Sequence, residues 1–307
     1  MKAARIHQFG PPDVIVIDEV PRPVPGAGEV LVRVASAGVG PWDALIREHT
    51  AVVQVALPIT LGSDLAGTVE AAGPGVTNFQ PGDLVYGATN PDFVGAYAEF
   101  ALAQAGMIAR KPGSLNFDQA ASAPVVAVTA WQMLFDYANA TPGQSVLIHG
   151  AAGNVGAYAV QLAAQAGLQV IATAASRDEP YLRSLGANTI IDYKATRFEE
   201  IAPKVDIVLD LVGGETQKRS FAVIKPGGIL VSAVSQPDAG GAEDIRAVFF
   251  LVEVTTERLN QISALFDEGR LTLRVGSVVP LEEVRTAHEM LAGAPHKPGK
   301  IVLTVAT

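Results

Sequence analysis

Residues 144–156 read QSVLIHGAAGNVG, an apolar run that ends in glycines at positions 150, 153 and 156. Glycines between a strand and a helix let backbone N–H groups approach a pyrophosphate, whose charge the helix N-terminus favours. The spacing is G-x-x-G-x-x-G rather than G-x-G-x-x-G, so the interpretation depends on a strand before the glycines and a helix after them. The alternative is a close-packed contact between helix and strand that binds nothing. We predict a dinucleotide site formed by Gly150, Gly153, Asn154, Val155 and Gly156.

The residues around this segment alternate between predicted strands and helices, which is typical of a doubly wound parallel sheet in an α/β protein. Strands are predicted at residues 145–149, 169–173, 189–191, 205–210 and 228–233, and helices at 118–137 (interrupted by Pro124), 155–167, 180–185, 215–224 and 257–268. The first third instead holds short β-branched runs such as residues 14–17 and 30–34, separated by prolines and glycines. That pattern predicts a barrel-like or sandwich β domain.

Length, charge and composition exclude several classes of function. The chain has 307 residues, enough for about two domains, and a net charge of −9, which argues against a nucleic-acid partner. Cysteine is absent, so thiolate nucleophiles, cysteine-ligated zinc and iron–sulfur clusters are excluded. Residues 144–176 carry no formal charge, but glycines interrupt them, so we expect no membrane span. The first residues, MKAARIH, lack the apolar core of a signal peptide, and we expect a cytoplasmic protein.

The end of the next predicted strand indicates which nicotinamide cofactor the site prefers. NAD sites place an acid there for the ribose 2′-OH, whereas NADP sites place a basic residue near the 2′-phosphate. Residues 170–177 read VIATAASR, with no carboxylate at the strand end. Ser176 and Arg177 can donate to a phosphate, which predicts NADPH. The alternative is that Arg177 is a solvated loop charge neutralised by Asp178.

Motifs along the whole chain resemble the zinc-free quinone oxidoreductases, the zeta-crystallin-like branch of the medium-chain dehydrogenase/reductase superfamily. They are MKAAR (1–5), LGSDLAG (61–67), PGD (81–83), GAYAE (95–99), HGAAGNVG (149–156), LGAN (185–188), IDY (191–193), DLVGG (210–214), KPGG (225–228) and GKIVL (299–303). The resemblance implies a GroES-like β-barrel-type substrate domain, residues 1–120 completed by 275–307, and a Rossmann dinucleotide-binding domain, residues 121–274. It places the active site in the cleft between them and implies a homodimer.

The resemblance also implies roles for further residues of the cofactor site. Thr129 would face the nicotinamide end, and Tyr193 would lie along the adenosine portion. The ribose and nicotinamide would lie over Val212, Gly213, Ala233 and Val234. Alternatives remain for the first two, because the Thr129 hydroxyl could cap a helical turn and Tyr193 could be a surface aromatic.

A metal-assisted mechanism is not expected. Zinc-dependent relatives carry a catalytic Cys where Gly40 stands and a metal-binding His where Ser63 stands. The five histidines show no i, i+4 pair, so we predict no metal site. No tyrosine has a lysine four residues later, and no other residue stands out as a general acid. Such a site suits an electron-poor conjugated acceptor, because hydride can add first and solvent can supply the proton.

One segment departs from the family pattern of Asn-Pro-x-Asp followed by Tyr two residues on. Here Gly40 replaces the Asn and Leu45 the Tyr. Trp42 offers a flat apolar wall for a planar ring, although an ordinary half-buried core Trp is the alternative. The substrate-lining candidates are Trp42, Leu45, Phe93 and Phe250.

We therefore predict an NADPH-dependent, metal-free oxidoreductase that transfers hydride to a quinone, a small-molecule conjugated acceptor. Two alternatives stay open: NADPH-dependent reduction of enone or enoyl double bonds, and a non-catalytic NADPH-binding protein.

Overall fold

The computed structural model describes residues 1–241 and 244–305. The chain divides into two compact units, Met1–Val125 with Val254–Thr307, and Val126–Glu253. Among the described residues, no helix combines the length and the apolarity needed to cross a bilayer.

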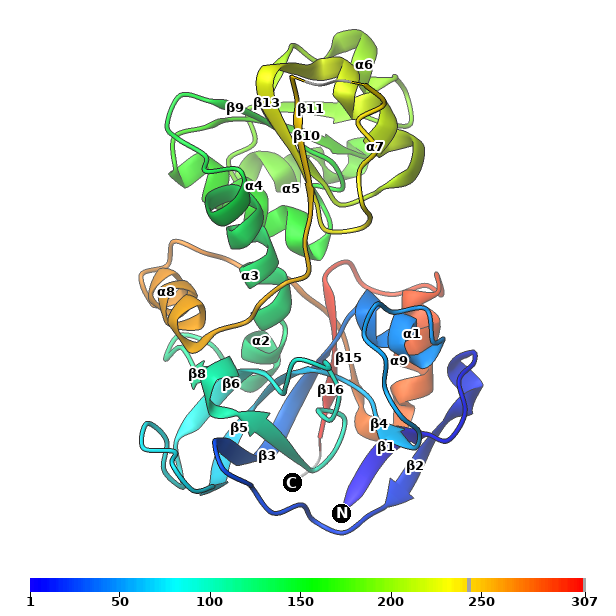
Figure 1. Cartoon of the computed structure of the whole chain (residues 1–307), viewed down its shortest axis with the longest axis vertical. Coiled ribbons are helices and arrows are strands. Elements are labelled where there is room, and N and C mark those ends of the chain that lie inside the picture. The colour runs from blue at the N-terminus through cyan, green and yellow to red at the C-terminus, as the bar shows by residue number, and fades with distance from the viewer. Residues whose placement is uncertain (242–243, 306–307) are drawn as a thin grey trace. The chain divides into compact units, whose positions relative to one another are not determined.

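The second unit is built on a six-stranded parallel sheet in the order β11-β10-β9-β12-β13-β14. The strands are β9 (Ser145–Ile148), β10 (Gln169–Ala174), β11 (Thr189–Asp192), β12 (Val205–Asp210), β13 (Ile224–Ser232) and β14 (Arg246–Phe249). The helices between them are α4 (Asn154–Gln165), α5 (Glu179–Ser184), α6 (Phe198–Ile201) and α7 (Gly214–Ser220) (Figure 1). The order changes direction at β9, as in a doubly wound sheet, so that prediction is confirmed.

The central strands of this sheet are mostly apolar because both faces are covered, although β12 contains Asp206 and Asp210. Leu147, Val208 and Leu230 are fully buried in one cluster with residues of the flanking segments. The sequence did not predict β14, whose four residues are exposed or half-buried and lack a clear alternation.

The first unit contains two β-sheets. A seven-stranded sheet has the order β15-β16-β3-β5-β6-β8, with β7 paired to β3, and a three-stranded sheet has the order β2-β1-β4. Their strands are β1 (Lys2–Ile6), β2 (Ile15–Glu19), β3 (Glu29–Val39), β4 (Ile59–Thr60), β5 (Asp64–Ala72), β6 (Leu84–Ala88), β7 (Phe100–Gln104), β8 (Ile108–Arg110), β15 (Val275–Pro280) and β16 (Lys300–Thr304). Most of these pairs are antiparallel, and the C-terminal β16 joins β3. The β-rich start and the returning tail therefore form one folded body.

The remaining α-helices of the described residues are α1 (Pro41–Arg47), α2 (Phe117–Ala121), α3 (Pro124–Trp131), α8 (Thr256–Asp267) and α9 (Val284–Leu291). A π-helical turn, Gln132–Tyr137, continues α3. Pro124 begins α3, so the helical stretch predicted at 118–137 is interrupted where the proline indicated.

The boundaries of the units differ from those predicted at residues 120 and 274. Helix α8 follows the strand–helix alternation in sequence, yet it packs against the first unit. Thr256 Oγ1 donates to the carbonyl of Ile108 at 2.6 Å, and Tyr86 Oη donates to the carbonyl of Leu259 at 2.8 Å. The segment from Val254 therefore belongs to the first unit, because its hydrogen bonds and apolar face are satisfied there.

Candidate cofactor site

The glycine loop between β9 and α4 has the local structure that its sequence predicts. Gly150 has φ +67°, a left-handed conformation that suits glycine, and Gly153 is the N-cap of α4. A Cβ on Gly156 would come within 2.4 Å of the Gly150 carbonyl oxygen. The first turn of α4 can thus lie on the loop only because residue 156 has no side chain.

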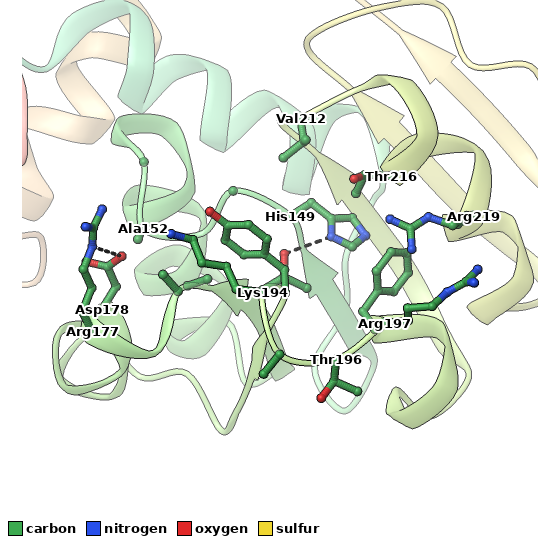
Figure 2. Close-up of a pocket in the computed structure, with 18 residues that line it drawn as sticks. His149, Ala152, Arg177, Asp178, Lys194, Thr196, Arg197, Val212, Thr216 and Arg219 are labelled. Carbon is green, nitrogen blue, oxygen red and sulfur yellow. Dashed lines mark hydrogen bonds and ion pairs between the residues drawn. The ribbon is translucent and has the colours of Figure 1, made fainter. Parts of the chain in front are cut away.

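A pocket of about 500 Å³ opens beside this loop, within the volume range of ordinary ligand sites (Figure 2). It lies at the carboxyl ends of parallel strands, where doubly wound sheets bind their ligands. The lining residues are His149, Gly150, Ala152, Gly153, Thr173, Ala174, Ala175, Arg177, Asp178, Tyr193, Lys194, Ala195, Thr196, Arg197, Phe198, Val212, Thr216 and Arg219.

Basic side chains surround the pocket, and they differ in how far carboxylates neutralise them. Arg219 lies 3.0 Å from Glu199, and Arg197 lies 2.7 Å from the same carboxylate. Arg177, with a side chain 82% exposed, lies 3.7 Å from Asp178. Lys194 lies between Arg177 and His149 in Figure 2. Its ammonium group forms no ion pair within the described parts of the chain.

His149 forms the buried wall of the pocket. Its Nδ1 lies 3.0 Å from Thr173 Oγ1, and its Nε2 lies 3.0 Å from Ser220 Oγ. Because Ser220 Oγ donates to the Thr216 carbonyl, it accepts from Nε2–H, and Thr173 donates to Nδ1. Burial lowers the pKa of His149 to about 4, so the ring is neutral at pH 7.

Asp210, at the end of β12, fixes the loop that brings Val212 to the pocket. Its Oδ1 accepts the N–H groups of Val212 at 3.0 Å and Gly213 at 2.8 Å. Its Oδ2 accepts from Gln217 Nε2 and Ser232 Oγ, both at 2.9 Å. Satisfied on both oxygens, the carboxylate orders this loop.

Comparison with known proteins decides the family. Residues 26–113 match the family model "Alcohol dehydrogenase GroES-like domain", and residues 185–303 match "Zinc-binding dehydrogenase". The quinone oxidoreductase of Mus musculus is 32% identical, over 99% of this chain and 97% of its own length. The chain belongs to the quinone oxidoreductases of the medium-chain dehydrogenase/reductase superfamily.

Solved structures agree with this family and with its fold. The quinone oxidoreductase from Coxiella burnetii is 36% identical with a TM-score of 0.92, covering 100% of this chain and 99% of that one. The Escherichia coli quinone oxidoreductase complexed with NADPH is 26% identical with a TM-score of 0.89, covering 99% and 100%. As a quinone oxidoreductase family member, the protein is an oxidoreductase whose GroES-like and Rossmann folds are as predicted.

The pocket brings together five of the predicted cofactor residues of this protein, namely Gly150, Gly153, Arg177, Tyr193 and Val212. The others lie outside its lining. The Lys194 backbone N–H donates to the Asp192 carboxylate and is the main cause of the lowered pKa of that acid, and Ser176 contributes a further hydrogen bond to it. The remaining residues are Thr129 in α3, Asn154, Val155 and Gly156 in α4, Gly213 at the start of α7, and Ala233 and Val234 after β13.

Sequence reasoning missed several lining residues, above all His149, Lys194 and Thr216. The position of Lys194 at the site could have been predicted, because the residue follows β11. This strand pairs with β10 in parallel and therefore ends at the same edge of the sheet. His149 precedes the first glycine of the motif, but only the fold places Ser220 beside it.

The substrate-lining candidates lie in different environments. Trp42 and Leu45 are both on α1, with Trp42 half-buried and Leu45 46% exposed. Phe93 has φ +57° and packs against the core of the first unit. Phe250 is buried, and its ring centroid lies 4.4 Å from that of Tyr137 within the second unit.

The zinc position of the family's metal-dependent relatives does not fit a metal in this chain. Gly40 has no ligand atom, and Ser63 Oγ accepts a hydrogen bond from Trp42 Nε1 at 2.9 Å. Across residues 1–241 and 244–305, no group of three or more His, Cys, Asp or Glu side chains could hold an ion.

Proposed function

We propose that this oxidoreductase transfers hydride from NADPH to a quinone without a metal ion. The observation that carries the cofactor assignment is the pair Arg177 and Lys194 at one pocket, next to a strand end made of Ala174 and Ala175. Two cations suit a 2′-phosphate, whereas an NAD site would offer a carboxylate at that strand end.

The residues around the pocket fit a dinucleotide. The positive end of α4 and the glycine loop favour the pyrophosphate, and Tyr193 offers an aromatic face beside the adenosine. Bound there, NADPH supplies a hydride at its nicotinamide. The protein's own contribution is to hold the dinucleotide in one orientation, through the loops fixed by His149 and Asp210.

A quinone is the acceptor that this chain is best suited to reduce. Hydride addition yields an aromatic hydroquinone anion, which takes its proton from solvent, so the step requires neither a Lewis acid nor a resident general acid. The absence of a suitable metal-ligand group among the described residues supports an acceptor that needs no polarisation. The homodimer and the cytoplasmic location stay predictions.

Steady-state rates test the proposal. NADPH or NADH oxidation is followed at 340 nm with a naphthoquinone, a benzoquinone and a short alkenal, before and after dialysis against chelator. We expect chelator-insensitive turnover of a quinone with NADPH preferred. Turnover of the alkenal alone would replace the quinone assignment by enone reduction, and cofactor binding without any turnover would indicate a non-catalytic protein.

A further inference from the structure

The side chain of Trp42 is fixed at three points inside the first unit. Its Nε1 donates to Ser63 Oγ at 2.9 Å, and the ammonium of Lys300 lies 4.2 Å from its ring centroid. A Cβ on Gly40 would come within 2.4 Å of two carbons of the six-membered ring. The indole therefore occupies the space that any side chain at position 40 would need.

Lys300 is itself held in place beside the indole. Its side chain is 2% exposed, and Nζ lies 3.0 Å from Oδ2 of the fully buried Asp64. The other Asp64 oxygen accepts the Val125 N–H at 3.1 Å. A buried ammonium is tolerated only where it is paired, and the carboxylate and the indole face are the partners it has here. Moving the indole would leave that cation less satisfied, so the ring orientation is strongly determined.

Trp42 is not completely enclosed. The residue is half-buried, and Leu45, three residues further along α1, is 46% exposed. Residues three apart are neighbours on the surface of a helix, which places Leu45 beside Trp42 on α1. An aromatic surface that is already ordered loses little conformational entropy when a flat ring stacks on it.

We propose that Trp42 is a rigid stacking platform for planar aromatic acceptors, and that Gly40, Ser63 and Lys300 are its positioning residues. The fused two-ring indole can stack on a two-ring quinone over a larger apolar area than on a flexible alkenal. The proposal also explains the departure at position 40, since the glycine makes room for the tryptophan. It rests on the proposed quinone reduction and narrows its substrate class to bicyclic quinones.

A fluorescence titration tests binding at Trp42 without altering it. The chain has two tryptophans, so Trp131→Phe leaves Trp42 as the sole tryptophan fluorophore. We expect 1,4-naphthoquinone, added without NADPH, to quench this emission saturably beyond the inner-filter loss measured with free N-acetyltryptophanamide. Quenching no greater than that of the free indole would overturn the platform. Saturable quenching in a protein that turns over no quinone would support the platform while the proposed function fails.

Kinetics of variants test selectivity. Trp42→Leu should raise KM for the naphthoquinone about tenfold, leave KM for a short alkenal unchanged, and change kcat little. Trp42→Phe should recover part of the loss, and the paired change Lys300→Met with Asp64→Asn should raise the same KM by loosening the ring. Leu45→Ala should raise the KM for the naphthoquinone less than Trp42→Leu does, and Leu84→Ala, its matched control, should leave it unchanged, because both leucines are 46% exposed and only Leu45 lies on α1. Equal KM increases for both acceptors in Trp42→Leu would contradict the proposal.

Discussion

His149 and Ser220 are joined by a hydrogen bond, with Nε2 of the imidazole 3.0 Å from the serine Oγ. This bond links the residue that follows β9, directly before the glycine loop, to the last residue of α7. The same ring is bonded to Thr173 of β10, so one neutral side chain ties together three elements that border the pocket.

Replacing this histidine should damage stability and cofactor binding together. His149→Leu removes the hydrogen bonds of the ring to the Thr173 and Ser220 hydroxyls, which we expect to cost about 1–3 kcal/mol of unfolding free energy. NADPH affinity should fall because the loop is no longer fixed. Urea unfolding and a titration of NADPH fluorescence measure the two effects, and an unchanged dissociation constant in a destabilised variant would show that the ring supports only the fold.

The pH dependence of His149 follows from its depressed pKa. The folded value of about 4 lies below the unfolded value of 6.5, so the unfolded state binds a proton first as the pH falls. The contribution of His149 to stability should therefore be lost as the pH falls from 6.5 to 4. His149→Gln, which stays neutral, should lack this loss relative to the wild type in urea unfolding, and parallel curves for the two proteins would contradict the assignment.

Asp43 predicts the opposite trend with pH. Tyr97 Oη and the Gly40 N–H both donate to its Oδ2 at 2.8 Å, whereas Oδ1 is buried without a hydrogen-bond partner in the described residues. Burial raises the pKa of this acid from 3.8 to about 7. The unfolded state thus releases the proton first as the pH rises, and the contribution of Asp43 to stability should fall by up to about 4 kcal/mol between pH 4 and 7.

Asp43→Asn tests this effect because it keeps the oxygen that both donors use. The variant should gain stability relative to the wild type as the pH rises from 4 to 7, measured by urea unfolding. Parallel curves for the two proteins would mean that Asp43 does not hold a proton at neutral pH.

Lys194 should recognise the 2′-phosphate. Lys194→Met should raise the dissociation constant of NADPH about tenfold, worth ~1.4 kcal/mol, with little change for NADH. Lys218→Met is a matched control, because Lys218 is an exposed lysine of the same unit paired with Glu215 outside the pocket. An equal loss for both cofactors would show that Lys194 does not read the phosphate.

Gly156→Ala should abolish tight cofactor binding, because its Cβ would lie 2.4 Å from the Gly150 oxygen and force α4 away from the loop. Gly106→Ala is the matched control, since a Cβ there meets no atom within 4 Å and φ is not positive. Thermal unfolding and NADPH titration of both variants give the comparison. Normal binding by Gly156→Ala would contradict the role of this contact.

The sequence was most informative where one local pattern determines one structure. The alternation of strands and helices predicted five of the six parallel strands, and the glycine spacing marked the loop that borders the pocket. Side chains brought together by strand order were harder to find. Lys194 enters the site because β11 lies beside β10, and Asp210 acts through backbone N–H groups that no spacing rule indicates.

The departure from the family pattern at position 40 likewise could not be explained from the sequence alone. Gly40 and Trp42 are close in sequence, but the reason for the pair is steric and needs coordinates. Lys300, whose ammonium lies over the Trp42 ring, belongs to the C-terminal strand β16. Only the fold brings this strand next to α1.

The decisive measurement is the ratio of kcat/KM for NADPH to that for NADH, with one naphthoquinone as acceptor after dialysis against chelator. We expect turnover with a ratio above about ten that falls toward one in Lys194→Met. No quinone turnover, turnover that requires an added metal ion, or a wild-type preference for NADH would contradict it.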